Sequence, residues 1–142
     1  MRFLLAVLLL IAIHADVRAC SCIWTNTEKD YQRSEAVFSA EVISLKRLLG
    51  KKKKDYGVIV ELKVIQRFKG MEGRTDTLKI KTGYGGGDCG FRFEAGKQYL
   101  IFASMSPMYN AKQKNELVTT VCSHTGLISR RTEELDFLNK QK

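Results

Sequence analysis

The sequence predicts a small, mostly β domain, a closed or partly closed antiparallel barrel of five strands with helices beside it. Five segments carry the β-branched and apolar residues, or the alternation, that strands prefer. Glycine-rich or charged stretches separate several of these segments, and helical patterns occur only near residues 27–34 and 132–142. Five strands is the count of the Greek-key barrel called the OB-fold.

Both helices are predicted from their ends. Residues 27–30 (TEKD) resemble a capping box with Asp in place of Glu, which predicts a short helix over about residues 27–34. In residues 132–142, Leu135 and Leu138 lie three apart and acidic residues come early, as the helix dipole favours. This pattern predicts a helix at the end of the chain.

The strands are predicted from apolar runs and from alternation. Residues 58–65 (VIVELKVI) place four apolar side chains on one face, those of Val58, Val60, Leu62 and Val64. The five expected strands cover residues 36–45, 58–65, 77–81, 98–103 and 116–121. Residues 50–55 (GKKKKD) are expected to form a solvated hairpin tip, and residues 83–88 (GYGGGD) a flexible loop before Cys89.

Residues 1–19 have the features of a secretion signal. Arg2 supplies the positive charge, and residues 3–13 (FLLAVLLLIAI) form an apolar run. Val17 and Ala19 provide small residues at positions −3 and −1 of a cleavage site. The run is shorter than the roughly 20 residues that a membrane-spanning helix needs. We therefore expect cleavage after Ala19 and a secreted, extracellular product.

Two other interpretations of this segment are an N-terminal core helix and a lipoprotein signal. The second requires small, uncharged residues before its cysteine, where this chain has Arg18. Secretion would leave one domain, residues 20–142, with a net charge of about +8, against +9 for the whole chain. We expect no transmembrane segment in it. A basic secreted protein tends to bind acidic glycans or membrane surfaces.

Four cysteines follow the expected cleavage site: Cys20, Cys22, Cys89 and Cys122. An even number in an oxidising compartment indicates two disulfides. Cys20 and Cys22 are too close in sequence to pair without strain, so each is expected to bond downstream. Two pairings remain open, 20–89 with 22–122 or 20–122 with 22–89. A structural zinc site, whose usual C-x2-C spacing is absent, and redox chemistry at free thiols are the competing uses.

Candidate catalytic residues are few. His124 is the one histidine after the expected signal, and the carboxylates show no spacing of an acid–base pair. The glycine loop lacks the Gly-Lys-Ser/Thr ending of a phosphate-binding loop, so it is interpreted as a surface loop or as part of a binding edge. We therefore expect neither enzymatic activity nor a cofactor of the protein's own.

A cluster of basic residues lies at and before the expected hairpin tip: Lys46, Arg47, Lys51, Lys52, Lys53 and Lys54. The simplest interpretation is a solvated loop. The alternative is contact with heparin-like glycans of the extracellular matrix, which gives one functional hypothesis, a non-inhibitory binding module. Nucleic acid is not an expected partner, because no aromatic stacking pattern accompanies the lysines.

The expected mature N-terminus has chemistry of its own. A chain that begins at Cys20 would have its first residue fixed by a disulfide, which lowers the cost of ordering it on binding. An α-amino group has a pKa of about 8, so part of it is neutral near pH 7. The neutral amine and the carbonyl oxygen of Cys20 can chelate a metal, and a catalytic zinc has an open position for such donors. Alternatively, the cysteines only fasten the chain end.

Six short segments, in this order along the chain, resemble the netrin-like superfamily: residues 20–22 (CSC), 36–42 (AVFSAEV), 68–70 (FKG), 89–91 (CGF), 96–102 (GKQYLIF) and 119–123 (TTVCS). The first of them, directly after the signal, is similar to the tissue inhibitors of metalloproteinases, whose inhibitory part is a netrin-like domain. The resemblance covers essentially residues 20–142. It implies an OB-fold barrel with flanking helices, and the disulfides Cys20–Cys89 and Cys22–Cys122.

The resemblance also implies a secreted inhibitor of zinc metalloproteinases of the matrix type. Cys20 would chelate the zinc ion of the target protease through its amine and carbonyl, and Ser21 would enter the mouth of the specificity pocket. Cys22 and Ile23 would extend along the cleft like bound peptide. A second part of the contact would come from the segment Gly87, Asp88 and Cys89.

The sequence departs from the vertebrate pattern of this family in three ways. It has four cysteines where those inhibitory domains have six, and we expect no second, cysteine-rich domain after residue 142. Both features are similar to the single-domain invertebrate members. Residues 85–88 (GGGD) are looser and more acidic than the family pattern leads us to expect.

Overall fold

The structure is a computed structural model of the chain, and it describes residues 20–23, 25–50, 55–73, 75–110, 112 and 114–141. The expected signal segment, residues 1–19, and the lysines Lys51–Lys54 lie outside the described residues. Within the described part, no helix is long and apolar enough to cross a membrane.

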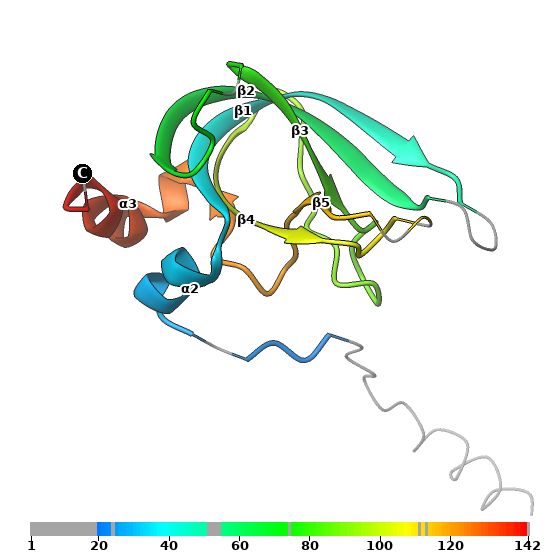
Figure 1. Cartoon of the computed structure of the whole chain (residues 1–142), viewed down its shortest axis with the longest axis horizontal. Coiled ribbons are helices and arrows are strands. Elements are labelled where there is room, and N and C mark those ends of the chain that lie inside the picture. The colour runs from blue at the N-terminus through cyan, green and yellow to red at the C-terminus, as the bar shows by residue number, and fades with distance from the viewer. Residues whose placement is uncertain are drawn as a thin grey trace, which may run out of the picture.

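Five strands pair in a ring that comes close to a barrel (Figure 1). The ring runs β1-β2-β3-β5-β4 and returns to β1, and a short sixth strand pairs with β4. The strands are β1 (Ala36–Leu48), β2 (Gly57–Lys69), β3 (Thr77–Thr82), β4 (Gln98–Ser106), β5 (Glu116–Val118) and β6 (Gly126–Leu127). The mostly β fold and the five predicted strands are confirmed.

The prediction of an all-antiparallel barrel is wrong at one junction. β3 and β5 pair in parallel, through Lys81 and Val118. β5 also ends three residues before the predicted boundary, because the chain then turns toward Cys89, whose carbonyl accepts a hydrogen bond from Val121 N at 3.0 Å. Lys81 closes this narrow junction as a buried cation, with Nζ 3.1 Å from a carboxylate oxygen of Glu116.

Two short helices lie outside the ring, as predicted. α2 (Thr27–Arg33) begins at the predicted residue and ends one residue before the predicted end. Its N-cap is Asn26 and not Thr27 of the capping-box pattern, and the Asn26 side chain accepts a hydrogen bond from Lys29 N at 2.9 Å. A turn of 3-10 helix, η1 (Ile128–Arg130), leads into α3 (Thr132–Asn139), which is shorter than the predicted segment.

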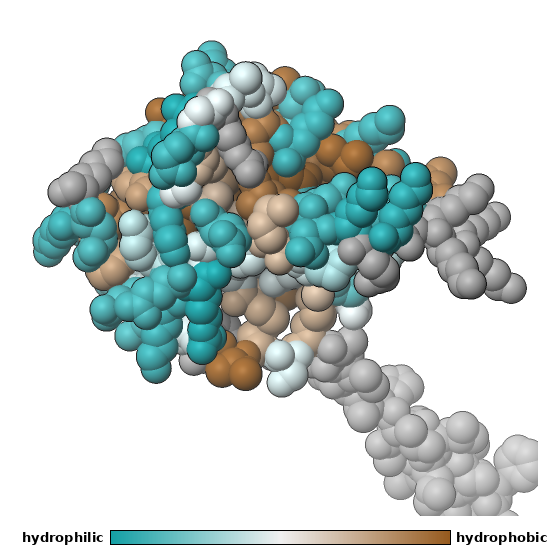
Figure 2. All heavy atoms as spheres, in the orientation of Figure 1, coloured by the Kyte–Doolittle hydropathy of each residue, from teal (hydrophilic) through white to brown (hydrophobic). Residues whose placement is uncertain are grey.

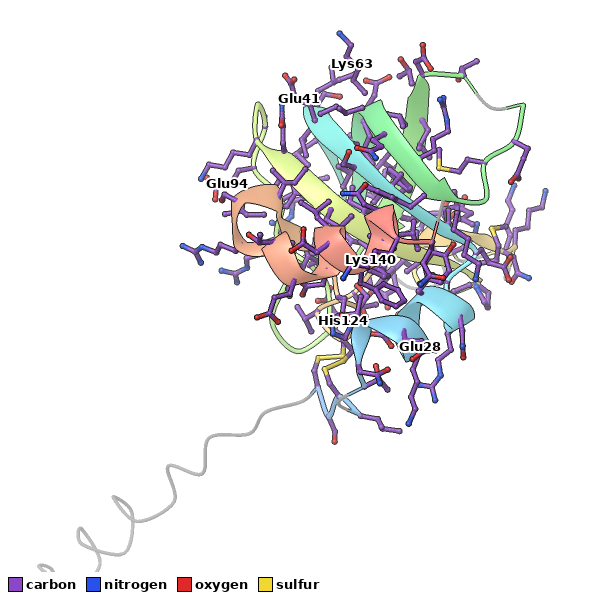
Figure 3. The ribbon with its side chains drawn as sticks, turned by 90° about the vertical axis from the view of Figure 1, so that its left-hand side faces the viewer. Glu28, Glu41, Lys63, Glu94, His124 and Lys140 are labelled. Carbon is purple, nitrogen blue, oxygen red and sulfur yellow. A yellow bond between two sulfur atoms is a disulfide. The ribbon has the colours of Figure 1, made fainter. Side chains whose placement is uncertain are left out.

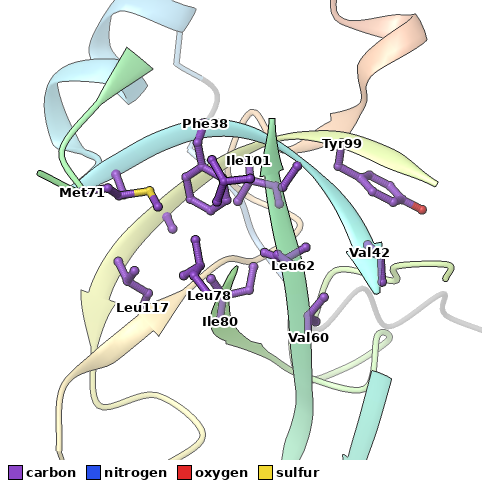
Figure 4. Close-up of a cluster of buried hydrophobic side chains, with 14 of the residues drawn as sticks. Phe38, Val42, Val60, Leu62, Met71, Leu78, Ile80, Tyr99, Ile101 and Leu117 are labelled. Atoms are coloured by element: carbon purple, nitrogen blue, oxygen red, sulfur yellow. The ribbon is translucent and has the colours of Figure 1, made fainter. Parts of the chain in front are cut away.

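Two hydrophobic clusters stabilise the fold. The larger fills the ring and includes Phe38, Leu62 and Ile101 (Figure 4). The smaller lies between the outer face of β1 and β4 and the two helices, and Leu138 of α3 is fully buried in it. Neighbouring residues of a strand point to opposite faces, so the continuous apolar run of β1 is explained by burial on both sides.

The predicted apolar face of β2 is confirmed. Val60, Leu62 and Val64 are buried in the larger cluster, and Val58 packs against it at one end of the ring. Beyond that end β1 and β2 continue as a two-stranded arm (Figure 1). In Figure 2 the apolar atoms visible on this side gather along the arm, whereas hydrophilic atoms cover α2.

Candidate functional site at the N-terminal disulfides

Two disulfides fasten the segment that the sequence singled out. Cys20 is bonded to Cys89 and Cys22 to Cys122, which is the first of the two pairings left open and the one that the family resemblance implies. Both bonds lie where the N-terminal segment joins the body of the molecule, next to His124 (Figure 3). All four cysteines are paired, so none is free as a zinc ligand or redox thiol.

The side chains of this segment differ in exposure. Cys20 and Cys22 are half-buried, whereas Ser21 is exposed and Ile23 is 83% exposed. The segment is neither helix nor strand. Ser21 and Ile23, the two residues predicted to contact a protease cleft beside the cysteines, are therefore both open to a partner.

The glycine loop that precedes Cys89 is organised around one carboxylate. Asp88 accepts hydrogen bonds from the backbone N–H groups of Tyr84 at 2.6 Å, Gly85 at 3.1 Å and Gly90 at 3.1 Å. The high glycine content did not predict this order. Because the carboxylate of Asp88 is occupied inside the loop, the exposed surface here consists of Gly86 and Gly87.

The loop is also tied to its surroundings by tyrosines. Tyr109 donates a hydrogen bond from its hydroxyl to the carbonyl of Asp88 at 2.7 Å, and Tyr84 donates to the carbonyl of Leu48 at the end of β1. The ring of Tyr56 contacts both tyrosines, with centroid distances of 6.2 Å to Tyr84 and 5.2 Å to Tyr109. Cys20 is therefore bonded to a loop that is itself anchored to the arm.

Tyr109 makes the anchoring of this loop sensitive to alkaline pH. Burial, with the nearby Asp88 and Tyr56, raises the pKa of Tyr109 to about 12 from an ordinary value of 10.0. The unfolded chain would lose this proton near pH 10 and the folded chain only near pH 12, so the stabilisation is complete below about pH 10 and is lost between these values.

We expect Tyr109→Phe to remove this part of the pH dependence. At pH 8 the variant should lose about 1 kcal/mol of unfolding free energy with the hydrogen bond to Asp88. From about pH 10 to pH 12 its urea midpoint should fall less steeply than that of the unmodified protein. Tyr31→Phe, which removes the hydroxyl that donates to Phe68 on the helix side, is the control and should keep the steeper fall. If the urea midpoints of Tyr109→Phe and the unmodified protein fall equally steeply with pH, the Tyr109 hydroxyl does not cause this part of the pH dependence.

The second disulfide is flanked by a histidine–carboxylate contact that the sequence did not predict. His124 Nδ1 contacts a carboxylate oxygen of Asp30 on α2, and the other oxygen of Asp30 accepts a hydrogen bond from Thr25. The two paired side chains are mostly covered. This contact ties α2 to the turn after Cys122, and the other described contact of the imidazole is the ring of Phe102. Asp30 therefore gives His124 a carboxylate neighbour that the sequence did not indicate.

The sequence predicts that the protein has no metal cofactor of its own, and this stays a prediction. Among the residues that the structure describes, no group of three or more His, Cys, Asp or Glu side chains could hold a metal ion.

Val121 is a surface residue of this site that the sequence prediction assigned to a strand. Its side chain is 46% exposed, directly before Cys122 in the chain. Its backbone N–H donates to the carbonyl of Cys89, so it links the two disulfide-bonded downstream cysteines. With Ser21, Ile23, Gly86 and Gly87 it forms the exposed surface around the two disulfides in the part of the chain that the structure describes.

Of the predicted basic cluster, the structure describes Lys46 and Arg47, and these two side chains lie on different faces of the arm. Lys46 pairs with Ile59 and Arg47 with Val58 in the β1–β2 ladder, so their side chains point to opposite faces. The guanidinium of Arg47 lies 4.2 Å from the ring centre of Tyr84.

Comparison of the chain with models of known protein families finds no match. A search of curated proteins finds no match either. The functional proposal therefore depends on the site geometry and on the sequence resemblance described above.

Proposed function

We propose that this protein is a secreted inhibitor of zinc metalloendopeptidases, built as an OB-fold of the netrin-like type. The observation that carries the proposal is how the segment Cys20-Ser21-Cys22 is held and exposed. A disulfide fixes it at each cysteine, and its middle side chain is exposed. The closed ring of five strands with two helices on its outside supports the fold assignment.

The inhibitory chemistry follows from removal of the signal after Ala19. The amide nitrogen of Cys20 then becomes a free amine, which in its neutral form is a zinc ligand. Together with the carbonyl oxygen of the same residue it forms a five-membered chelate on the zinc of the target. The chelate occupies the position where the peptidase would activate water, so the target cannot hydrolyse substrate.

The anchoring of Cys20 favours tight binding. A flexible N-terminus loses conformational freedom when it enters a cleft, at a cost of about 0.5–1.5 kcal/mol for each side chain that becomes immobile. Here much of that cost is already met by folding, because Cys89 and its loop are held by Asp88 and Tyr109.

The exposed surface around the two disulfides has the composition expected of a contact with a protease cleft. Ile23 and Val121 supply exposed apolar area, and Gly86 and Gly87 allow the backbone to approach closely. The side chain of Ser21 is small enough to enter even a narrow specificity pocket of a protease. The carboxylate of Asp88 contributes by ordering the loop and not by direct contact.

The test uses the protein secreted with its own signal. N-terminal sequencing should show Cys20 as the first residue, and titration against catalytic domains of matrix-type zinc peptidases should reach full inhibition at one inhibitor per enzyme. A serine peptidase assayed with the same fluorogenic peptide is the control and should be unaffected. A product that begins at Cys20, contains both disulfides and leaves every zinc peptidase of the panel active at micromolar concentration would refute the proposal.

A further inference from the structure

The arm leaves one edge of β1 without a strand partner. Inside the ring β1 is paired on both sides, with β2 and, over residues 36–41, with β4. The last backbone contact on the β4 side is at Val42, whose N–H donates to the carbonyl of Lys97 at 3.0 Å and whose carbonyl accepts from Gly96 N at 2.8 Å. Beyond Val42, β2 is the strand that pairs with β1 in the described part of the chain (Figure 1). Residues 43–48 therefore form an open sheet edge.

The hydrogen bonds of the neighbouring strands show which backbone groups of β1 face this open edge. Thr119 N donates to the carbonyl of Lys81 at 3.1 Å, so Lys81 of β3 turns its backbone groups toward β5. Backbone groups of successive strand residues alternate between the two edges, so those of Thr82 face β2, where Thr82 pairs with Val58. Val58 thus uses its groups on β3. Arg47, which pairs with Val58 on the other side, therefore directs its N–H and C=O to the open edge.

Leu45 faces the open edge for the same reason. It pairs with Val60, which lies two residues from Val58 and therefore also directs its backbone groups to β3. Among the hydrogen bonds described outside the strand ladders, none involves the backbone of Leu45 or Arg47, and both residues are exposed. Each of them therefore offers one donor and one acceptor, which is the pattern that an added antiparallel strand pairs with.

A groove of about 410 Å³ lies beside the open edge, within the usual range of roughly 300–1,000 Å³ for ligand sites. Leu45 and Arg47 line it from β1, and Phe91 and Phe93 line it from a segment that is neither helix nor strand. Leu45 is 41% exposed there. Directly paired residues of an antiparallel ladder share a face, so an added strand would place the side chains opposite Leu45 and Arg47 in this groove.

The charges of the groove favour an acidic strand. Arg47 and Arg92 both line it, and neither has a carboxylate partner among the described contacts. The acidic residue of the lining is Glu94, and its carboxylate pairs with Lys97 at 2.7 Å. The guanidinium of Arg47 lies 4.2 Å from the ring centre of Tyr84, which orients Arg47 without neutralising it.

We propose that the open edge of β1 binds an extended acidic segment of another protein, which adds an antiparallel strand to the sheet. The bound segment has a glutamate or aspartate opposite Arg47 and, two residues later, an apolar residue opposite Leu45. Main-chain hydrogen bonds provide affinity in this mode of recognition, and the groove provides specificity for alternate side chains. Arg47 can hold the carboxylate through two N–H groups at once. The amine of Cys20 takes no part, so this proposal does not depend on the proposed inhibition.

A second copy of this chain fits the edge less well. Two-fold antiparallel pairing in this register, with Leu45 opposite Arg47 of the second copy, would also place Lys46 opposite its own counterpart. Like charges directly opposite each other in a ladder are destabilising. The formal net charge of +9 on each chain opposes the same association and favours an acidic partner.

The test is an NMR titration of the secreted, isotope-labelled protein with the end-blocked peptide Ser-Thr-Glu-Thr-Val-Thr-Ser. The amide signals of Leu45 and Arg47 should shift and become protected from hydrogen exchange. N-methylation of the peptide's valine removes the N–H that would donate to the carbonyl of Leu45, and it should weaken binding by roughly tenfold. N-methylation of the threonine between glutamate and valine is the matched control. Its N–H faces away from β1, so binding should be unchanged.

Variants of the protein test the same edge. Arg47→Gln should weaken binding by roughly tenfold and reduce its dependence on salt. Leu45→Pro removes an N–H that the β1–β2 ladder does not use, so it should fold and lose binding, whereas Leu45→Val should keep most of the affinity. Arg33→Gln on α2, which lies away from the arm in Figure 1, should bind as the unmodified protein does. Thermal melts check folding, and the N-methylated peptides test the edge even if Leu45→Pro does not fold.

Three results would overturn the proposal. The first is no saturable binding of the peptide at millimolar concentration. The second is equal affinity for the two N-methylated peptides, which would mean that the backbone of β1 does not pair with the ligand. The third is equal affinity for a peptide of the same composition in scrambled order, because charge attraction alone would then explain binding. Peptidase inhibition by Arg47→Gln should be unchanged, so failure of strand addition and failure of the proposed inhibition are distinguishable.

Discussion

Adding one alanine in front of Cys20 is expected to weaken inhibition of a zinc peptidase by at least about a thousandfold. The added residue converts the amine of Cys20 into an amide, which has no lone pair to donate to zinc, and it places extra atoms where the metal would lie. Loss of one metal bond of about 4 kcal/mol corresponds to this factor. The measurement is the inhibition constant of the purified, extended protein against the peptidase that the unmodified protein inhibits best.

The matched control carries the extra alanine after Lys142 and should inhibit as the unmodified protein does. Both proteins should contain the two disulfides by mass spectrometry and should melt at the same temperature, because Cys20 is held from the side of Cys89. Equal inhibition by the N-terminally extended protein would exclude chelation by the amine and would leave the rest of the exposed surface as the source of any inhibition.

The parts of the fold that the sequence predicted are those with a local signal. The alternation of Val58, Val60, Leu62 and Val64 can be recognised in the sequence, because a strand with one buried face has an apolar residue at every second position. The parallel contact of β3 with β5 and the two-residue β6 carry no such signal, since each depends on where distant segments meet. The sequence therefore predicted the strands and a closed or partly closed barrel, but not the parallel pairing of β3 with β5.

The residues of the candidate site also differ in whether the sequence signals them. Cys20 and Cys22 stand out in the sequence because disulfide chemistry restricts their partners to two pairings, and the family resemblance selects between them. The contact of Asp30 with His124 joins residues 94 apart, and no sequence pattern links them. Asp88 did have a usable signal, because an aspartate near glycines commonly accepts hydrogen bonds from nearby backbone N–H groups. That signal would have predicted an ordered loop.

The second large effect is expected on stability. Replacing Cys22 and Cys122 together by serine should lower the free energy of unfolding by about 4 kcal/mol, because the disulfide closes a loop with a sequence separation of 100. A crosslink that restricts so long a loop of the unfolded chain contributes about this much in the chain-entropy model. Urea unfolding of the double variant, with Cys20–Cys89 intact, measures the loss.

His124→Gln is the comparison that separates the covalent bond from the contacts beside it. It breaks the hydrogen bond with Asp30 at the same junction while the disulfide remains, and it should cost about 1 kcal/mol. The double cysteine variant should also inhibit more weakly, since Ser21 and Ile23 lose one of the two bonds that hold their segment. If it unfolds at the same urea concentration as His124→Gln, the noncovalent contacts of α2 already order the N-terminal segment, and the disulfide does not supply the rigidity on which the inhibitory mechanism depends.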